Sequence, residues 1–355
     1  MAKIGIIGAG AWGTALGAAL SRCNHSVCLW ALEKDVCESI NNEHINKRFL
    51  PKFKLPENIV ATNDMDFAAK DKNLIILASP SIYLLSTVRQ LLRTPSFSNT
   101  EPSEQFAIGI LTKGFIPDEN GYPRFITDTL ESILPEPYKN RLVYIAGPSH
   151  GEEVAMGKLT GLIAASKNPM AAIRCREILK SRQLLVYSGL DVIGVQTSAA
   201  AKNIIAIAFG LLDALTETSD IFGDNTESLL LAAGLNEIQT LGRALGATHP
   251  ETFTSISGVG DLDVTCRSKF GRNRRFGMEI IKEDILSRFT GIDDIIANIA
   301  KIGYLPEGVV ACKHVQKICE KLNLKLSITM GLYKILNKEV EPTEFIDKIL
   351  HGENI

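Results

Sequence analysis

The sequence predicts an α/β protein in which a doubly wound, mostly parallel sheet is followed by an all-helical domain. Three observations support this fold class. The first half alternates short apolar runs with helix-length segments, which is typical of parallel strands connected by helices. A glycine-rich motif directly follows the first apolar run. After Asp191 the strand signals end, and long segments with apolar residues at helical spacing replace them.

Eight short runs rich in Ile, Val and Leu predict the strands of the sheet. They are Ile4–Ile7, Val27–Trp30, Asn58–Thr62, Leu74–Leu77, Phe106–Thr112, Leu142–Ala146, Leu162–Ala165 and Leu184–Tyr187. The segments between them predict helices on the faces of the sheet, at Gly13–Cys23, Asp35–Asn42, Ile82–Leu92, Pro123–Ser132 and Pro169–Leu179. The Pro- and Ser-rich segment Thr94–Ser103 predicts a surface loop.

The second half predicts helices only. Long segments at Val192–Leu215 and Thr226–Leu245 carry apolar residues at helical spacing, and shorter ones follow at Glu307–Lys321, Ser327–Leu336 and Thr343–Leu350. A length of 355 residues also corresponds to two domains of ordinary size. We therefore expect a first domain at residues 1–190 and a second at residues 191–355.

The composition is that of a globular protein, with 45% hydrophobic and 22% charged residues and a formal net charge of −2. This charge argues against a dedicated nucleic-acid-binding protein, so a bound anion must be held by a local cluster of cations. The seven cysteines are scattered, without a C-x-x-C pair or zinc spacing, which favours reduced thiols and no metal site. Apolar runs such as 74–78 are too short to span a membrane, and no targeting signal is evident, so we expect a cytoplasmic protein.

The motif Gly-Ala-Gly-Ala-Trp-Gly at residues 8–13 lies between the first predicted strand and the first predicted helix. In this context Gly8 permits a tight turn, Gly10 lets backbone N–H groups approach a pyrophosphate, and Gly13 allows close helix–strand packing. The N-terminus of the helix adds a site for an anion. The pattern predicts a Rossmann-type dinucleotide-binding domain rather than a plain glycine turn.

The second predicted strand is followed by an acidic and a basic residue, which favour different forms of the cofactor. Glu33 lies in the window where a carboxylate binds the ribose hydroxyls of NAD, whereas Lys34 is placed to meet the extra phosphate of NADP. A solvated pair at the start of the next helix explains the two residues equally well. All three interpretations stay open at this point.

Polar residues also follow two later strands, at the sheet edge where open α/β folds bind ligands. Lys113 can meet a phosphate or a carbonyl there, although such strand-end lysines are most often surface residues. Gly147, Pro148 and Ser149 predict a rigid turn that brings backbone close to a nicotinamide. His150 is a weaker candidate for a general acid, because a polar residue at a helix start is the commoner explanation.

Lys202 is the one lysine in a segment of small and apolar residues, 199–206. Burial of an ammonium is costly without a partner and lowers its pKa towards the range that is useful for proton transfer. Lys202 is therefore a candidate catalytic residue, the alternative being a lysine whose stem covers apolar surface. Asp261, in Gly-Val-Gly-Asp-Leu, is a candidate partner on a flexible turn, or a cap of the following segment.

Five basic residues lie within the nine residues of segment 267–275. Guanidinium groups bind phosphate through paired hydrogen bonds, so this basic run is a candidate phosphate site. A nucleic-acid patch is the rival explanation. The near-neutral net charge and the lack of stacking aromatic residues make it the weaker one.

Seven motifs, taken together and in this order, make the sequence similar to the bacterial NAD(P)-dependent glycerol-3-phosphate dehydrogenase family along nearly the whole chain. They are Gly-x-Gly-Ala-Trp-Gly-Thr-Ala-Leu from residue 8, Thr-Lys-Gly from 112, Ala-Gly-Pro-Ser from 146, Ala-Lys-Asn-Ile-Ile-Ala-Ile from 201, Gly-Val-Gly-Asp-Leu from 258, Gly-Arg-Asn-Arg-Arg-Phe-Gly from 271 and Glu-Gly from 307.

The resemblance implies roles for individual residues. It implies cofactor contacts for Gly8, Gly10, Ala11, Trp12, Gly13, Leu32, Glu33, Lys113, Gly151, Arg272, Leu305 and Glu307. It implies substrate contacts for Lys113, Gly147, Ser149, Lys202, Asn203, Asp261, Gly271, Arg272 and Asn273. Lys202 matches the family's catalytic lysine, with Asp261 beside it. Leu32 stands where many relatives carry Arg or His, which argues against strong NADPH selectivity and leaves dual use open.

The implied reaction is hydride transfer between NAD(P)H and dihydroxyacetone phosphate, giving sn-glycerol 3-phosphate for phospholipid synthesis. In it, Lys202 is the general acid and base, Asp261 orients it, and Arg272 anchors the phosphate. We expect a homodimer with a small-molecule substrate, no nucleic-acid partner and no membrane-spanning segment. The alternatives are a dehydrogenase of the same plan for another phosphorylated or hydroxy-acid substrate, and a non-catalytic dinucleotide sensor.

Overall fold

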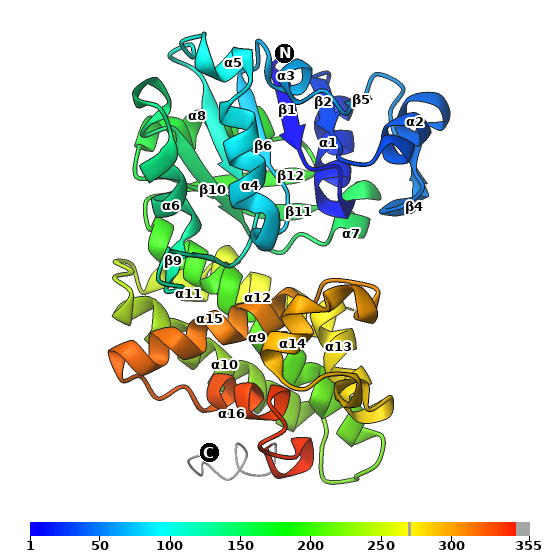
Figure 1. Cartoon of the computed structure of the whole chain (residues 1–355), viewed down its shortest axis with the longest axis vertical. Helices are drawn as coiled ribbons and strands as arrows, with labels where there is room; N and C mark the ends of the chain where they lie inside the picture. The colour runs from blue at the N-terminus through cyan, green and yellow to red at the C-terminus, as the bar shows by residue number, and fades with distance from the viewer. Residues whose placement is uncertain (269–270, 346–355) are drawn as a thin grey trace. The chain divides into compact units, whose positions relative to one another are not determined.

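The computed structural model describes residues 1–268 and 271–345, which belong to two compact units (Figure 1). The first unit consists of residues 1–112 and 126–192, and the second begins with residues 113–125 and resumes at residue 193. Segment 113–125 therefore belongs to the second unit although the sequence places it within the first half. A functional division between residues 190 and 191 stays a prediction.

The first unit contains a sheet of eight strands. They are β1 (Lys3–Ile7), β2 (Ser26–Trp30), β5 (Val60–Thr62), β6 (Leu74–Leu77), β7 (Ala107–Ile110), β10 (Leu142–Ala146), β11 (Thr160–Ala165) and β12 (Leu184–Gly189). Their order is β12-β11-β10-β7-β6-β1-β2-β5. All neighbours are parallel except β10 and β11. The predicted mostly parallel, doubly wound sheet is confirmed.

From β1 the chain continues to β2 and β5 on one side of β1 in the sheet, and it then crosses to β6 on the opposite side of β1. The central strands are buried along almost their full length, as continuous apolar runs require when helices cover both faces. Because the direction of winding reverses between β1 and β6, their carboxyl ends form the crevice where open α/β sheets bind ligands.

Helices surround this sheet (Figure 1). They are α1 (Ala11–Arg22), α2 (Lys34–Glu43), α3 (Met65–Ala69), α4 (Ser81–Leu92), α5 (Pro95–Ser98), α6 (Ile126–Ile133), the 3₁₀ turn Glu136–Tyr138, α7 (Gly151–Ala155) and α8 (Pro169–Leu179). Two expectations were wrong in detail. The helix expected from Pro123 begins only at Ile126, because Pro123–Phe125 form a strand, and the expected loop Thr94–Ser103 contains α5. The short hairpin of β3 (Ile45–Asn46) and β4 (Leu50–Lys54) was not predicted.

The second unit is helical apart from one hairpin, formed by β8 (Phe115–Pro117) and β9 (Pro123–Phe125). Its described helices are α9 (Val192–Thr216), α10 (Asp224–Ala244), α11 (Glu251–Thr254), α12 (Asp261–Arg267), α13 (Arg272–Lys282), α14 (Ile292–Ala297), α15 (Glu307–Leu322) and α16 (Ser327–Leu336). A π turn covers Ile256–Gly260, and 3₁₀ turns cover Ile285–Arg288 and Ile299–Ile302. Most of the helix expected at Thr343–Leu350 lies outside the described residues.

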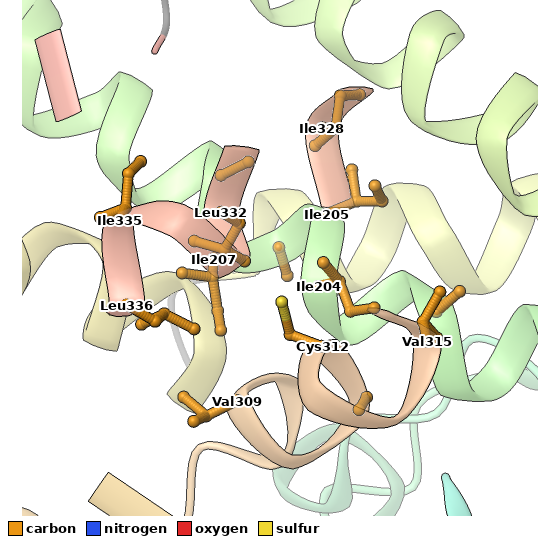
Figure 2. Packing of buried hydrophobic residues seen from close by; sticks show 14 of the residues in the cluster. Ile204, Ile205, Ile207, Val309, Cys312, Val315, Ile328, Leu332, Ile335 and Leu336 are labelled. Carbon is orange, nitrogen blue, oxygen red and sulfur yellow. The ribbon is translucent and has the colours of Figure 1, made fainter. Parts of the chain in front are cut away.

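Helix α9 forms the centre of the second core. Among the described helices it alone is long and apolar enough to cross a membrane, but 89% of its most apolar window is buried inside the protein, as in the core helix of a folded domain. Figure 2 shows how its isoleucines pack with residues of α15 and α16. The labelled residues are Ile204, Ile205, Ile207, Val309, Cys312, Val315, Ile328, Leu332, Ile335 and Leu336.

Two glycines bring α13 against α9. A Cβ on Gly210 would lie 1.9 Å from the backbone oxygen of Arg274, and one on Gly277 would lie 2.1 Å from that of Ile207. Only glycine permits so close an approach of the two backbones. The contact fixes the position of α13, whose first residue is Arg272.

Candidate functional site

The glycine-rich loop packs tightly against the end of β6. Gly8 has a φ of +125°, and a Cβ there would lie 2.8 Å from the carbonyl carbon of Ala78. A Cβ on Gly13 would lie 2.2 Å from the Gly8 oxygen. Because no larger residue fits at either position, the loop holds the start of α1 at the crevice between β1 and β6.

The N-terminus of α1 fits a pyrophosphate. Gly10 is its N-cap, no described side chain caps it, and the first turn carries no acidic residue. Apart from Gly10 and its chain neighbours, no atom of the described residues lies within 4 Å of the position where Gly10 would carry a Cβ, so the approach to the N–H groups is open. Gly151, the first residue of α7, is packed so closely that a Cβ would lie 3.3 Å from Ala11.

The residues after β2 surround the expected position of the ribose. Leu32 is 75% exposed, and Glu33 is the N-cap of α2 but uses no side-chain hydrogen bond to cap it. The Glu33 carboxylate therefore stays available, with Nη2 of Arg48 at 3.9 Å. Lys34 begins α2 and is in none of the ion pairs of the described residues.

The turn after β10 is rigid. Gly147 has a φ of +142°, and a Cβ there would lie 2.4 Å from the Gly161 oxygen. The Ser149 hydroxyl is buried and donates to the Gly147 oxygen at 2.8 Å. His150 lies at the start of α7. Contacts of Gly147 and Ser149 with a substrate stay predictions.

Lys202 and Asp261 form a buried ion pair in the second unit. Nζ of Lys202, on α9, donates to Oδ1 of Asp261, and the side chains are only 3% and 1% exposed. The alternative in which the Lys202 stem lies on the surface is therefore excluded. Asp261 was expected on a flexible turn, but it is the first residue of α12, directly after the π turn. Its backbone oxygen accepts a 2.6 Å hydrogen bond from the Thr265 hydroxyl, as in a regular helix.

Three charged groups meet at this point. Burial lowers the pKa of Lys202, the Asp261 carboxylate opposes that shift, and the nearby Lys113 ammonium adds to it. Lys113 precedes strand β8, so the hairpin of the second unit carries it to Lys202. Oδ2 of Asp261 is buried and makes no hydrogen bond within the described residues. A buried acceptor without a donor costs about 1–3 kcal/mol, so it suits a ligand hydroxyl.

Asn203 and Asn273 connect three helices beside this pair. Nδ2 of Asn273 donates to Oδ1 of Asn203 at 2.9 Å, and the Gly308 N–H donates to Oδ1 of Asn273 at 2.9 Å. The chain of bonds joins α9, α13 and the first turn of α15. Glu307 directly precedes Gly308, Leu305 lies two residues before Glu307, and both are partly exposed.

The cations of the basic run (residues 267–275) differ in whether a carboxylate pairs with them. Three of its arginines are held by carboxylates: Arg267 by Asp263 and Glu227, Arg274 by Asp213, and Arg275 by Glu279. Arg275 also stacks on Tyr304, 4.7 Å from the ring centre. Arg272 follows the N-cap Gly271 of α13, is exposed, and takes part in no ion pair within 1–268 and 271–345. Lys269 lies outside the described residues.

Asn46, on β3, is a site residue that the sequence analysis did not identify. Its side chain is fully buried, and Nδ2 donates to the Ala9 oxygen and to Oγ1 of Thr14, both at 2.8 Å. These bonds attach the β3–β4 hairpin to the glycine-rich loop. A single polar residue in a short run has no periodicity, so only the tertiary contact reveals it.

The described residues contain no group of three or more His, Cys, Asp or Glu side chains arranged for a metal ion. All seven cysteines are free thiols, and six of them are buried: Cys28, Cys37, Cys175, Cys266, Cys312 and Cys319. Burial raises the pKa of Cys28 to about 11, so this thiol is protonated and unreactive near neutral pH.

Comparison with known proteins identifies the family. Residues 3–172 match the family model described as NAD-dependent glycerol-3-phosphate dehydrogenase N-terminus, and residues 191–347 match the corresponding C-terminus model. Proteins named glycerol-3-phosphate dehydrogenase [NAD(P)+] are 66% identical in Treponema denticola and 55% identical in Treponema pallidum, each covering 99% of both chains. The crystal structure of glycerol-3-phosphate dehydrogenase from Coxiella burnetii has a TM-score of 0.83 at 29% identity, covering 98% of both chains. The chain therefore belongs to the NAD-dependent glycerol-3-phosphate dehydrogenase family.

Proposed function

We propose that the chain is a glycerol-3-phosphate dehydrogenase, which transfers hydride between NAD(P)H and dihydroxyacetone phosphate and gives sn-glycerol 3-phosphate. It is an NAD(P)-dependent oxidoreductase that acts on a CH–OH group. The observation that carries this proposal is the buried ion pair of Lys202 and Asp261. The names of the Treponema relatives support the substrate and the cofactor.

The bound cofactor supplies or accepts the hydride. We assign its pyrophosphate to the loop and first turn of α1, formed by Gly8, Gly10, Ala11, Trp12 and Gly13, because that turn is open and uncapped. The remaining cofactor contacts are assigned to Leu32, Glu33, Lys113, Gly151, Arg272, Leu305 and Glu307.

Lys202 moves the proton. As hydride reaches the central carbonyl carbon, negative charge grows on the carbonyl oxygen, and the Lys202 ammonium stabilises it and donates a proton. In the reverse direction the neutral amine removes the hydroxyl proton. Asp261 fixes the direction of the ammonium through Oδ1, and its unpartnered Oδ2 accepts a hydrogen bond from a substrate hydroxyl.

Arg272 anchors the substrate phosphate. It is the cation of the basic run that no carboxylate holds within the described residues. Binding energy from the phosphate, remote from the reacting carbon, then positions the carbonyl for transfer. Gly271 and Asn273 border the same turn, with Asn203, Gly147 and Ser149 as further substrate contacts.

One assay tests the proposal. Oxidation of NADH is followed by the loss of its near-ultraviolet absorbance with dihydroxyacetone phosphate, unphosphorylated dihydroxyacetone and a panel of hydroxy-acid precursors. We expect turnover with dihydroxyacetone phosphate far above that with the others. Turnover only with a keto acid would identify a different dehydrogenase, and binding of NADH without turnover of any compound would indicate a sensor.

We also propose the pathway, the location and the oligomeric state of the enzyme. Its product is the backbone of glycerophospholipids, so we assign it to phospholipid synthesis in the cytoplasm, and we expect a homodimer. Light scattering of the purified protein tests the dimer, and a mass of one chain at micromolar concentration would contradict it.

A further inference from the structure

The β3–β4 hairpin is attached to the pyrophosphate loop through one buried side chain. Asn46 donates to the Ala9 oxygen and to Thr14 on one side, and its Oδ1 accepts the Phe49 N–H at 3.0 Å on the other. One amide therefore fixes both the loop at the start of α1 and the turn of the hairpin. The residues of that turn, 47–49, keep a defined distance from the dinucleotide loop.

Arg48 lies in this turn and points towards the end of β2. Its Nη2 is 3.9 Å from Oε1 of Glu33, and its guanidinium carbon is 5.4 Å from the ring centre of Phe49. The side chain is 53% exposed, so the guanidinium contacts both Glu33 and solvent. At 3.9 Å the two groups are too far apart for a hydrogen bond, so Glu33 holds the guanidinium only loosely and another anion can compete for it.

We propose that Arg48 allows this chain to accept NADPH as well as NADH, by offsetting the charge of Glu33 when the adenosine ribose carries a 2′-phosphate. The inference rests on the proposed dinucleotide site. Glu33 alone accepts hydrogen bonds from two ribose hydroxyls but repels a phosphate at the same place. With Arg48 beside it, the same position takes the hydroxyls of NADH or the phosphate of NADPH.

Arg48 suits this task better than Lys34, the cation beside Glu33 in the sequence. A guanidinium presents a planar fork that matches two phosphate oxygens, whereas an ammonium is a point charge. Arg48 also comes from a segment that Asn46 attaches to the pyrophosphate loop. Lys34 is free to turn into solvent from the first turn of α2.

The experiment compares the binding of adenosine 2′,5′-bisphosphate and 5′-AMP, which differ only in the 2′-phosphate. Binding is measured by titration calorimetry on the full chain, without substrate. Arg48→Ala is expected to weaken binding of the bisphosphate about three- to fivefold and to change binding of 5′-AMP less than about twofold, as for the loss of one exposed charge contact. The difference should shrink in high salt. Lys47→Ala is the matched control, because it removes a cation from the same turn that is paired with Glu43 at 2.5 Å.

Three outcomes decide the question. The assignment is supported if Arg48→Ala weakens binding of the bisphosphate selectively and Lys47→Ala leaves the binding of both nucleotides unchanged. If Arg48→Ala weakens binding of both nucleotides equally, or of neither, the role of Arg48 is overturned, while the proposed dinucleotide site itself stands. If the unmodified chain bound neither nucleotide, the proposed site itself would be wrong, and the inference would fall with it.

Discussion

Nζ of Lys202 donates to Oδ1 of Asp261 across 59 positions of sequence, and both side chains are buried in the second unit. Two charges removed from water seldom stabilise a fold more than apolar residues of the same volume would. Lys113 adds a second ammonium at this point, which further disfavours a purely structural role. The arrangement instead suits chemistry, because it holds an ammonium with a lowered pKa in a fixed direction.

Replacement of Lys202 by Met should abolish most of the activity. The variant keeps a similar side-chain volume but has no proton to donate, so we expect kcat to fall by about 10²–10⁴-fold. NADH binding should stay nearly unchanged, because Lys202 is not among the residues assigned to the cofactor. Steady-state kinetics and a fluorescence titration with NADH measure the two effects. Comparable turnover in Lys202→Met would remove Lys202 from the mechanism.

The ion pair also predicts a pattern of stabilities. Lys202→Met leaves the buried Asp261 carboxylate without its ammonium partner, and Asp261→Leu leaves the buried Lys202 ammonium beside Lys113 without its carboxylate. Each change should lower the free energy of unfolding by about 3–5 kcal/mol. The double variant removes both members of the buried pair and should recover most of that loss. Denaturant unfolding followed by circular dichroism measures all four proteins. Simple additivity of the two losses would show that the groups do not interact.

The lowered pKa of Lys202 predicts opposite pH dependences for the two directions of the reaction. Reduction needs the ammonium, so its kcat should fall as pH rises through the pKa of Lys202. Oxidation needs the neutral amine, so its kcat should rise over the same range. Because burial lowers this pKa, both changes should occur below about pH 10.4, the ordinary value for lysine. Profiles of kcat at saturating substrate measure them, and a transition only at the ordinary value would contradict the shift.

The fold was predictable where burial is continuous. The strands of the sheet are short apolar runs covered on both faces, such as Leu74–Leu77, and the sequence pattern alone reveals them. The hairpin of β3 and β4 was missed because Leu50–Lys54 contains Pro51 and two exposed lysines, which is typical of a loop as well. Short edge hairpins are held by tertiary bonds such as those of Asn46 rather than by their own pattern.

The candidate site was predictable only in part. The sequence singled out Lys202 and Asp261 as candidate partners, and the two are in contact; their roles in the reaction stay predictions. It did not distinguish among the arginines of the basic run. That distinction depends in particular on Asp213, which lies 61 positions from Arg274 in the sequence and approaches it only in the folded chain.

The difference among these arginines can be tested with paired variants. Arg272→Gln should raise the KM for dihydroxyacetone phosphate about 10- to 100-fold, as for the loss of a hydrogen bond to a charged group, with a smaller change in kcat. Arg267→Gln is the control, because Asp263 and Glu227 already hold that side chain. Steady-state kinetics with NADH saturating give both values. An unchanged KM in Arg272→Gln would count against the phosphate site.

NADH and NADPH should both be accepted by this chain. Leu32 contributes no charge at the ribose, Glu33 opposes a 2′-phosphate, and Lys34 and Arg48 favour one. These charges are partly exposed and of opposite sign, so they largely cancel, and water screens the remainder. We therefore expect the values of kcat/KM for the two cofactors to differ by less than about a hundredfold, roughly 2.7 kcal/mol. Assays at low and high ionic strength with each cofactor measure the ratio, which should move towards one as salt is added. A ratio above about a hundredfold that does not change with salt would contradict this prediction, because it would require residues other than these to distinguish the two cofactors.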